Sequence, residues 1–84
     1  MGQAIKPIQG FKFILPSNDH LPNHVHVYKG NFEVRIDISS DVAVLMKGEK
    51  HRKAANDAKM RKVALQLVNE NLLAIQQAWR DIHE

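Results

Sequence analysis

Three of the five histidines in this chain of 84 residues, His20, His24 and His26, lie within a stretch of seven residues. Imidazole gains and loses a proton near neutral pH and is the commonest metal ligand among side chains. Because residues two apart in a β-strand point to the same face, His24 and His26 can act together if this stretch is extended. His20 precedes them in a turn-forming segment and can reach the same place from a loop.

A β-hairpin is expected to hold these histidines in position. Residues 25–29 and 32–38 alternate apolar and polar side chains, and Gly30-Asn31 between them is a typical two-residue turn. This turn predicts the following cross-strand pairs: Lys29 with Phe32, Tyr28 with Glu33, Val27 with Val34, His26 with Arg35, Val25 with Ile36, and His24 with Asp37. A slip by one residue would place polar side chains in the core, so the pattern specifies this register.

The hairpin has two unlike faces in this register. The side chains expected in the core are Val25, Val27, Val34, Ile36 and Ile38. The opposite side, which we call the histidine face, carries His24, His26, Tyr28, Glu33, Arg35 and Asp37. Neighbouring side chains across the two strands are close enough to touch, so these groups can share protons and hydrogen bonds. The histidine face is therefore the candidate site.

Metal binding is one interpretation of this site. The ligands would be His20, His24 and His26, with a carboxylate from Asp19 or Asp37. Histidine and carboxylate ligands suit a divalent transition metal such as zinc, nickel, copper or iron. A thiolate site is excluded because the chain has no cysteine.

Acid–base chemistry on a phosphodiester without a metal is a second interpretation. Cleavage of RNA needs a base, an acid and a cation that stabilises the charge developing on phosphorus. His24, His26, Glu33 and Arg35 supply side chains of the required types, and Tyr28 is an alternative proton donor. The sequence predicts no substrate pocket for this reaction.

A third interpretation gives the histidines a structural role. His20 and His24 would order the loop around Pro22 by hydrogen bonding, and the polar pairs across the hairpin would each contribute about 0.2 to 1 kcal/mol. The protein would then be a binding module. Its contact surface would be the histidine face, with Tyr28 and His20, or a basic part of the chain.

The basic part of the chain is residues 47–62, which we call the basic segment. It holds seven basic and two acidic residues, a local charge of +5 in a chain whose net charge is +3. The side chains expected to contact nucleic acid phosphates are Lys50, Arg52, Lys53, Lys59, Arg61 and Lys62. The alternative is a solvated loop and first helical turn. The segment contains no aromatic residue, so base stacking is not expected there.

The remaining elements follow from periodicity. Residues 11–15 predict a strand, and the apolar run 42–46 predicts a short, well-buried one. A helix capped by Asn56 or Asp57 has its apolar stripe at Met60, Val63, Ala64, Leu67, Val68, Leu72, Ile75, Trp79 and Ile82. Residues 69–71 allow either one long helix or two. Trp79 is expected in the core.

These elements predict an α+β fold, a small antiparallel sheet of three or four strands with one face covered by C-terminal helices. The length fits a single domain spanning residues 1–84. The chain shows no signal peptide pattern, no apolar run of membrane-spanning length and no cysteine. A cytoplasmic protein without membrane contact is therefore expected.

The motif Asp19-His20-x-Pro22-x-His24-x-His26, the Gly30 turn, the strand end Ile36-Asp37-Ile38 and a helical tail with Leu72, Leu73 and Trp79 together form a recognisable pattern. It resembles the small bacterial domain of unknown function family 4160, over roughly residues 8–83. Asn23 departs from the family pattern, which usually has a second proline there. Residues 48–59 also look longer than the family's connection, which commonly holds a Leu-Pro pair.

The resemblance implies a small β-sheet with helices and no settled activity. Members often look like one partner of a two-gene arrangement, in the manner of a type II toxin–antitoxin pair. The expected partner is therefore a small cognate protein, with nucleic acid or a second copy of the chain as alternatives. No cofactor is specified beyond the transition metal of the first interpretation.

Overall fold

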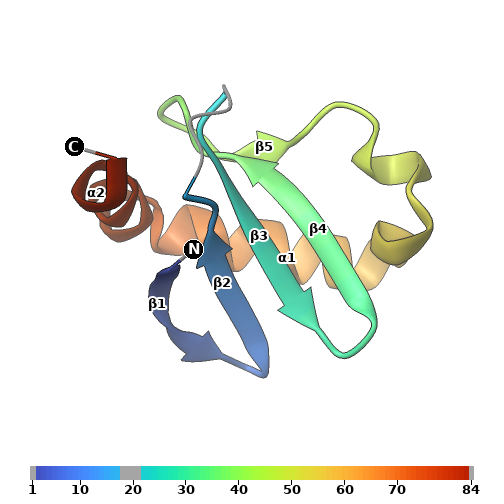
Figure 1. Cartoon of the computed structure of the whole chain (residues 1–84). Coiled ribbons are helices and arrows are strands. Elements are labelled where there is room, and N and C mark those ends of the chain that lie inside the picture. Colours follow the sequence, from blue (N-terminus) through green and yellow to red (C-terminus); the bar gives the residue numbers. More distant parts are fainter. Residues whose placement is uncertain (1, 18–21, 84) are drawn as a thin grey trace.

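The computed structural model describes residues 2–17 and 22–83. Its strands are β1 (Gly2–Ile8), β2 (Phe11–Leu15), β3 (His24–Lys29), β4 (Phe32–Asp37) and β5 (Val44–Leu45). Two short 3-10 turns, η1 (Glu49–His51) and η2 (Lys53–Ala55), lead into the helices α1 (Ala58–Glu70) and α2 (Leu72–His83). The α+β class is thus as expected (Figure 1).

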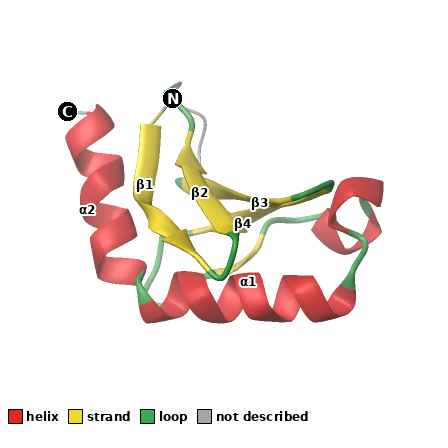
Figure 2. Ribbon diagram, turned by 90° about the horizontal axis from the view of Figure 1, so that it is seen from below, coloured by secondary structure: helices red, strands yellow, loops and turns green. Residues whose placement is uncertain are grey.

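The five strands form one antiparallel sheet in the order of the sequence, β1 to β5. Helix α1 lies across one face, and α2 runs past edge strand β1 toward the opposite side (Figures 1 and 2). The prediction of three or four strands was therefore close but not exact, because it did not include β1. Gly2 and Pro7 disfavour a strand, and β1 tolerates them because it is an edge strand whose pairing with β2 shifts register twice.

The hairpin formed by β3 and β4 has the predicted register in all six pairs. Val25, Val27, Val34 and Ile36 have no exposed surface, and they pack in one core with Ala64, Leu67 and Val68 of α1. The polar residues of the two strands consequently point away from α1. This confirms the division of the hairpin into an apolar face and the histidine face.

The predicted buried strand at residues 42–46 was wrong in extent and in burial. Only Val44 and Leu45 are in a strand, and the side chains of Val42 and Val44 are 59% and 50% exposed. The burial falls instead on Ala43, whose backbone is held by the side chain of Asn69, with N–H to Oδ1 at 2.8 Å and Nδ2 to the carbonyl at 3.2 Å. These hydrogen bonds tie the loop before β5 to α1.

The C-terminal region forms two helices. Asp57 is the N-cap of α1, since its Oδ1 accepts a hydrogen bond from the backbone N–H of Met60 at 3.0 Å. The break falls at Asn71, whose Nδ2 donates to the carbonyl of Leu67 at 2.8 Å and so competes with helical continuation. Trp79 is 6% exposed, as expected for a core residue, whereas Ile82 at the end of the stripe is 38% exposed.

We expect Val34→Asp to lower the free energy of unfolding by at least about 3 kcal/mol, because it buries an unpaired charge between the sheet and α1. Val44→Asp, at an exposed position, is the matched control and should stay within about 0.5 kcal/mol of the wild type. Urea unfolding followed by circular dichroism measures both. Equal stability of the two variants would contradict this assignment of the faces.

Candidate functional site

The histidine face carries a row of aromatic rings along β3 that continues onto α2. Tyr28 stacks on His26 with ring centroids 6.1 Å apart, and His26 lies 5.1 Å from His24. His24 lies 6.2 Å from Trp79, which in turn stacks on His83 at 3.8 Å. Because α2 reaches this side of the sheet, His24 is only 8% exposed. The accessible part of the row is therefore its His26 and Tyr28 end.

Hydrogen bonds fix the tautomers of the two strand histidines. Nδ1 of His24 lies 2.9 Å from the carbonyl oxygen of Pro22, and Nδ1 of His26 lies 2.9 Å from Oε2 of Glu33. A carbonyl or carboxylate oxygen only accepts, so Nδ1 carries the proton in both rings. Each neutral imidazole then has its lone pair on Nε2, where it can accept a proton or bind a ligand.

Glu33 connects His26 to a network of four charged side chains, which we call the ion-pair network: Glu33, Arg35, Glu49 and Arg52. Arg52 donates through Nη2 to Glu33 Oε1. It also reaches Glu49, with Nε to Oε2 at 2.8 Å and Nη2 to Oε1 at 3.1 Å. Arg35 binds the same carboxylate, with Nη2 to Oε2 at 3.0 Å and Nε to Oε2 at 3.2 Å. The four charges cancel.

The carboxylate of Glu49 has no exposed surface. Burial by itself raises the pKa of Glu49, but the hydrogen bonds from Arg52 and Arg35 outweigh burial and leave that pKa below its ordinary value. Hydrogen bonds to Glu49 and to Glu33 raise the pKa of Arg52. Both groups are therefore charged at neutral pH, and the buried carboxylate is stabilised by its partners.

The ion-pair network also covers the part of β4 that the short strand β5 leaves open. The backbone N–H of Arg35 donates to Glu49 Oε1 at 2.6 Å, and its carbonyl accepts from the N–H of Met46 at 3.1 Å. One register step along, the carbonyl of Glu33 accepts from Arg52 Nη2 at 3.0 Å. Side chains thus take the place of the strand that would otherwise pair here.

The arginines and the lysines of the basic segment have different environments. Arg52 is engaged in the ion-pair network, and Arg61 donates through Nη1 to the carbonyl of Ala55 at 2.8 Å. The lysines predicted to contact phosphates are all exposed: Lys50, Lys53, Lys59 and Lys62. The description as a solvated loop therefore fits these lysines and does not fit Arg52.

Sequence reasoning missed Glu49, which looked like an isolated acid among basic residues. The only signal for it is the preceding Gly48, whose φ of 87° turns the chain back toward the sheet. It also missed two residues of β2. Lys12 and Ile14 pair with Tyr28 and His26 across the sheet, so they extend the histidine face beyond the hairpin.

Tyr28 can act as a proton donor on this face. Burial first, and the charge of Glu33 second, raise the pKa of its phenol above the ordinary value, with Arg52 opposing them. The phenol is therefore protonated at neutral pH. Asp37, by contrast, accepts hydrogen bonds from the N–H and hydroxyl of Ser39 at 2.8 and 2.5 Å and so belongs to the following turn.

The predicted metal site is only partly described by the structure. His24 and His26 lie together, but residues 2–17 and 22–83 contain no group of three or more histidine, aspartate or glutamate side chains that could hold an ion. His20 and Asp19 lie outside the described residues. Metal binding by His20, His24 and His26 therefore stays a prediction.

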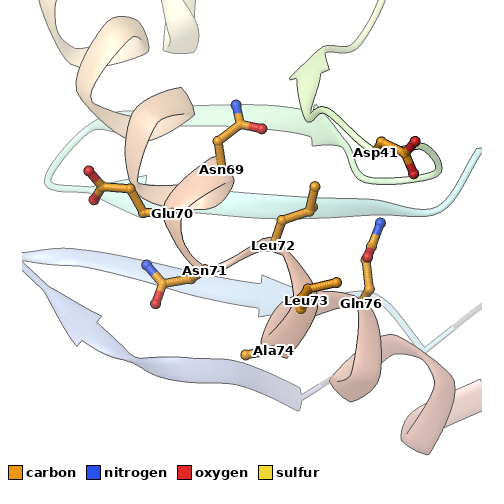
Figure 3. Close-up of a pocket in the computed structure, with 8 residues that line it drawn as sticks. All are labelled: Asp41, Asn69, Glu70, Asn71, Leu72, Leu73, Ala74 and Gln76. Atoms are coloured by element: carbon orange, nitrogen blue, oxygen red, sulfur yellow. The ribbon is translucent and has the colours of Figure 1, made fainter.

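Two hollows occur away from the histidine face. One, of about 540 Å³, lies at the junction of α1 and α2 beside the loop that precedes β5 (Figure 3). The other, of about 300 Å³, lies beside the hairpin turn and is lined in part by Lys29, Lys53 and Asp57. Across the described ranges, no helix is long and apolar enough to cross a membrane.

Comparison with known proteins gives one match. A family model described as "Domain of unknown function (DUF4160)" matches residues 10–80. No curated protein and no solved structure matches the chain.

Glu49→Gln should lower the free energy of unfolding at pH 7 by about 2–4 kcal/mol, because it leaves two guanidinium groups without their buried counterion. Arg52→Ala should also destabilise the protein, whereas Lys50→Ala, at an exposed position of the same segment, should change stability by less than about 0.5 kcal/mol. Urea unfolding measures all three. Similar stabilities of Arg52→Ala and Lys50→Ala would contradict the network.

The stability difference between the wild type and Glu49→Gln should depend on pH. The pKa of Glu49 is lowered on folding, so its contribution is complete above the unfolded value of about 4.3 and is lost as the pH falls through the folded value. The stability difference between wild type and Glu49→Gln should therefore shrink as the pH falls below about 4.3. Unfolding curves between pH 7 and pH 3 measure it, with exposed Glu70→Gln as the control. A difference that is constant over this range would contradict the lowered pKa.

Proposed function

The chain belongs to the DUF4160 family of domains of unknown function, and we propose that it is a cytoplasmic binding module that docks a small cognate protein on its histidine face. In this proposal it is one component of a two-gene system of the type II toxin–antitoxin kind. The observation that carries the proposal is the ion-pair network, which leaves a rigid, electrically neutral and partly exposed surface around His26, Tyr28 and Arg35.

The chemistry of this surface supports a protein partner. Tyrosine and arginine are enriched among the residues that contribute most to protein–protein binding, and Tyr28 and Arg35 are both partly exposed here. The arginines are already neutralised by Glu33 and Glu49, so they add little attraction for a phosphate backbone. Because the network holds Arg35 and His26 in place before binding, little conformational entropy of these side chains is lost on docking.

The shape of the surface supports the same proposal. Small-molecule sites are usually concave, and the two hollows described above lie at the helix junction and the hairpin turn instead. A partner with its own surface does not need a recess. A second copy of the chain is the alternative occupant, and it would give a homo-oligomer.

The test is isothermal titration calorimetry with the protein encoded by the neighbouring gene. Tyr28→Ala and His26→Ala should each weaken binding by about tenfold or more, because they remove ring area from the centre of the contact. Lys62→Ala, on the exposed side of α1, is the matched control. Melting temperatures identify variants that lose stability instead of affinity. Unchanged affinity in the double variant of Tyr28 and His26 would contradict the proposal.

The His26–Glu33 hydrogen bond supports a second candidate, cleavage of RNA without a metal. Glu33 would hold His26 with its Nε2 free to accept the 2′-hydroxyl proton, and Tyr28 would protonate the leaving oxygen. Arg35, although paired with Glu49, is 37% exposed, and the N–H groups on its exposed side would stabilise the phosphorane. His24, the other predicted catalytic histidine, is buried against Trp79. It would not contact the RNA and would instead pack against the His26 ring and help to hold it in position.

Incubation of the purified protein with a defined RNA, with and without chelator, tests this candidate. Cleavage that persists with chelator, is lost in His26→Ala and falls at least about tenfold in Glu33→Gln is the expected result for acid–base catalysis. Cleavage lost with chelator would indicate a metal instead. Salt-dependent binding without cleavage, weakened when Lys50, Lys53, Lys59 and Lys62 become glutamate, would indicate a nucleic-acid-binding module.

A further inference from the structure

Leu73 is the most exposed large apolar side chain among the described residues, at 82%. It stands in the first turn of α2, next to Leu72, which is only 8% exposed and belongs to the core. Although adjacent residues of a helix point in different directions, both leucines line one hollow, so an exposed apolar side chain lies close to a core residue there. Leu73 lines the hollow at the junction of α1 and α2, which we call the junction hollow (Figure 3).

The walls of the junction hollow are held in place by amide side chains. Gln76 donates through Nε2 to the carbonyls of Ile38 and Ser40, at 2.9 and 3.0 Å. Asn69 binds both backbone groups of Ala43. These contacts fix the loop at residues 38–43 against both helices, so the hollow exists before any ligand arrives.

The side-chain oxygens that remain at the hollow are acceptors, and they lie beside the first backbone N–H groups of α2. Because the amide nitrogens of Asn71 and Gln76 donate inward, their oxygens are left for a ligand. Asp41 and Glu70 add two carboxylates, on either side of the helix junction (Figure 3). No lysine or arginine is among the residues that line the hollow. The side chains that line it therefore combine two leucines with hydrogen-bond acceptors and negative charge.

We propose that the junction hollow docks a basic peptide segment of another protein, which places an apolar side chain against Leu73 and Leu72 and lysine or arginine side chains on Asp41 and Glu70. The commitment to a basic peptide rests on charge complementarity. A nucleic acid would bring phosphates against the carboxylates, and a second copy of the chain docked symmetrically would bring the carboxylates against each other. A basic peptide satisfies the acceptors and covers Leu73 at once.

This docking site is separate from the histidine face and does not depend on the function proposed for it. The histidine face lies on the side of the sheet opposite to α1, whereas the junction hollow opens at the end of α1. One protein could in principle reach both surfaces, and the variants below act on only one of them. Failure at the hollow would therefore leave the proposal for the histidine face unchanged.

Fluorescence anisotropy with a labelled nine-residue peptide of alternating lysine and leucine tests the proposal. Wild-type protein should bind this peptide at low salt, and binding should weaken in 0.5 M NaCl because the paired charges are partly exposed. The same peptide with glutamate in place of lysine should not bind. Leu73→Ser, and the double variant Asp41→Asn with Glu70→Gln, should each weaken binding by at least about fivefold.

Matched controls identify the surface. Val44→Ser removes another exposed apolar side chain, Asp81→Asn another exposed carboxylate, and Tyr28→Ala a side chain of the histidine face. All three should bind the peptide as the wild type does. The proposal is overturned if the glutamate peptide binds equally well, if Leu73→Ser binds normally, or if Tyr28→Ala abolishes binding. It is also overturned if sedimentation shows that Leu73 instead mediates self-association that Leu73→Ser removes.

Discussion

A single buried carboxylate determines how the connection between the sheet and the helices is arranged. Glu49 has no exposed surface and receives hydrogen bonds from the side chains of Arg35 and Arg52 and from the backbone of Arg35. An unpaired charge at this depth would cost several kcal/mol, so the carboxylate and its two partners must come together for the chain to fold here. The residues around Glu49 are therefore fixed against β4.

The arrangement of the histidine face follows from this constraint. Arg52, held by Glu49, binds Glu33, and Glu33 binds Nδ1 of His26. At the other end of β3, α2 brings Trp79 onto His24 and so closes that end of the ring row. The exposed part of the histidine face therefore lies between the ion-pair network, which contacts β4, and the His24–Trp79 ring pair, which contacts α2.

The part of this structure that depends on local patterns could be predicted from the sequence. The Gly30-Asn31 turn and the alternation of the two strands specified every pair of the hairpin, because a register slip would have exposed valines and buried charges. The apolar stripe likewise placed Trp79 in the core, and the asparagines at residues 69 and 71 indicated where a break was possible without deciding between one helix and two. The family expected from the histidine motif is the one whose model matches.

The rest depends on contacts between distant segments. Strand β1 contains Gly2 and Pro7 and is stabilised by β2 and α2, so its own residues do not predict it. The side chains of Val42 and Val44 are exposed because Asn69 and Gln76 hold the neighbouring backbone, a role that periodicity does not reveal. Glu49 and Arg52 are far from Glu33 and Arg35 in sequence, and a charge run gives no indication of which of its members will be buried.

The most direct measurement of the central claim is a nuclear magnetic resonance titration of the ¹⁵N-labelled chain with the protein encoded by the neighbouring gene. If the histidine face is the docking surface, the largest changes in amide chemical shift will map to residues 24–28 of β3 and 33–37 of β4, with smaller ones at Lys12 and Ile14. Changes confined to the exposed side of α1 or to the hairpin turn, with β3 and β4 unaffected, would contradict the account.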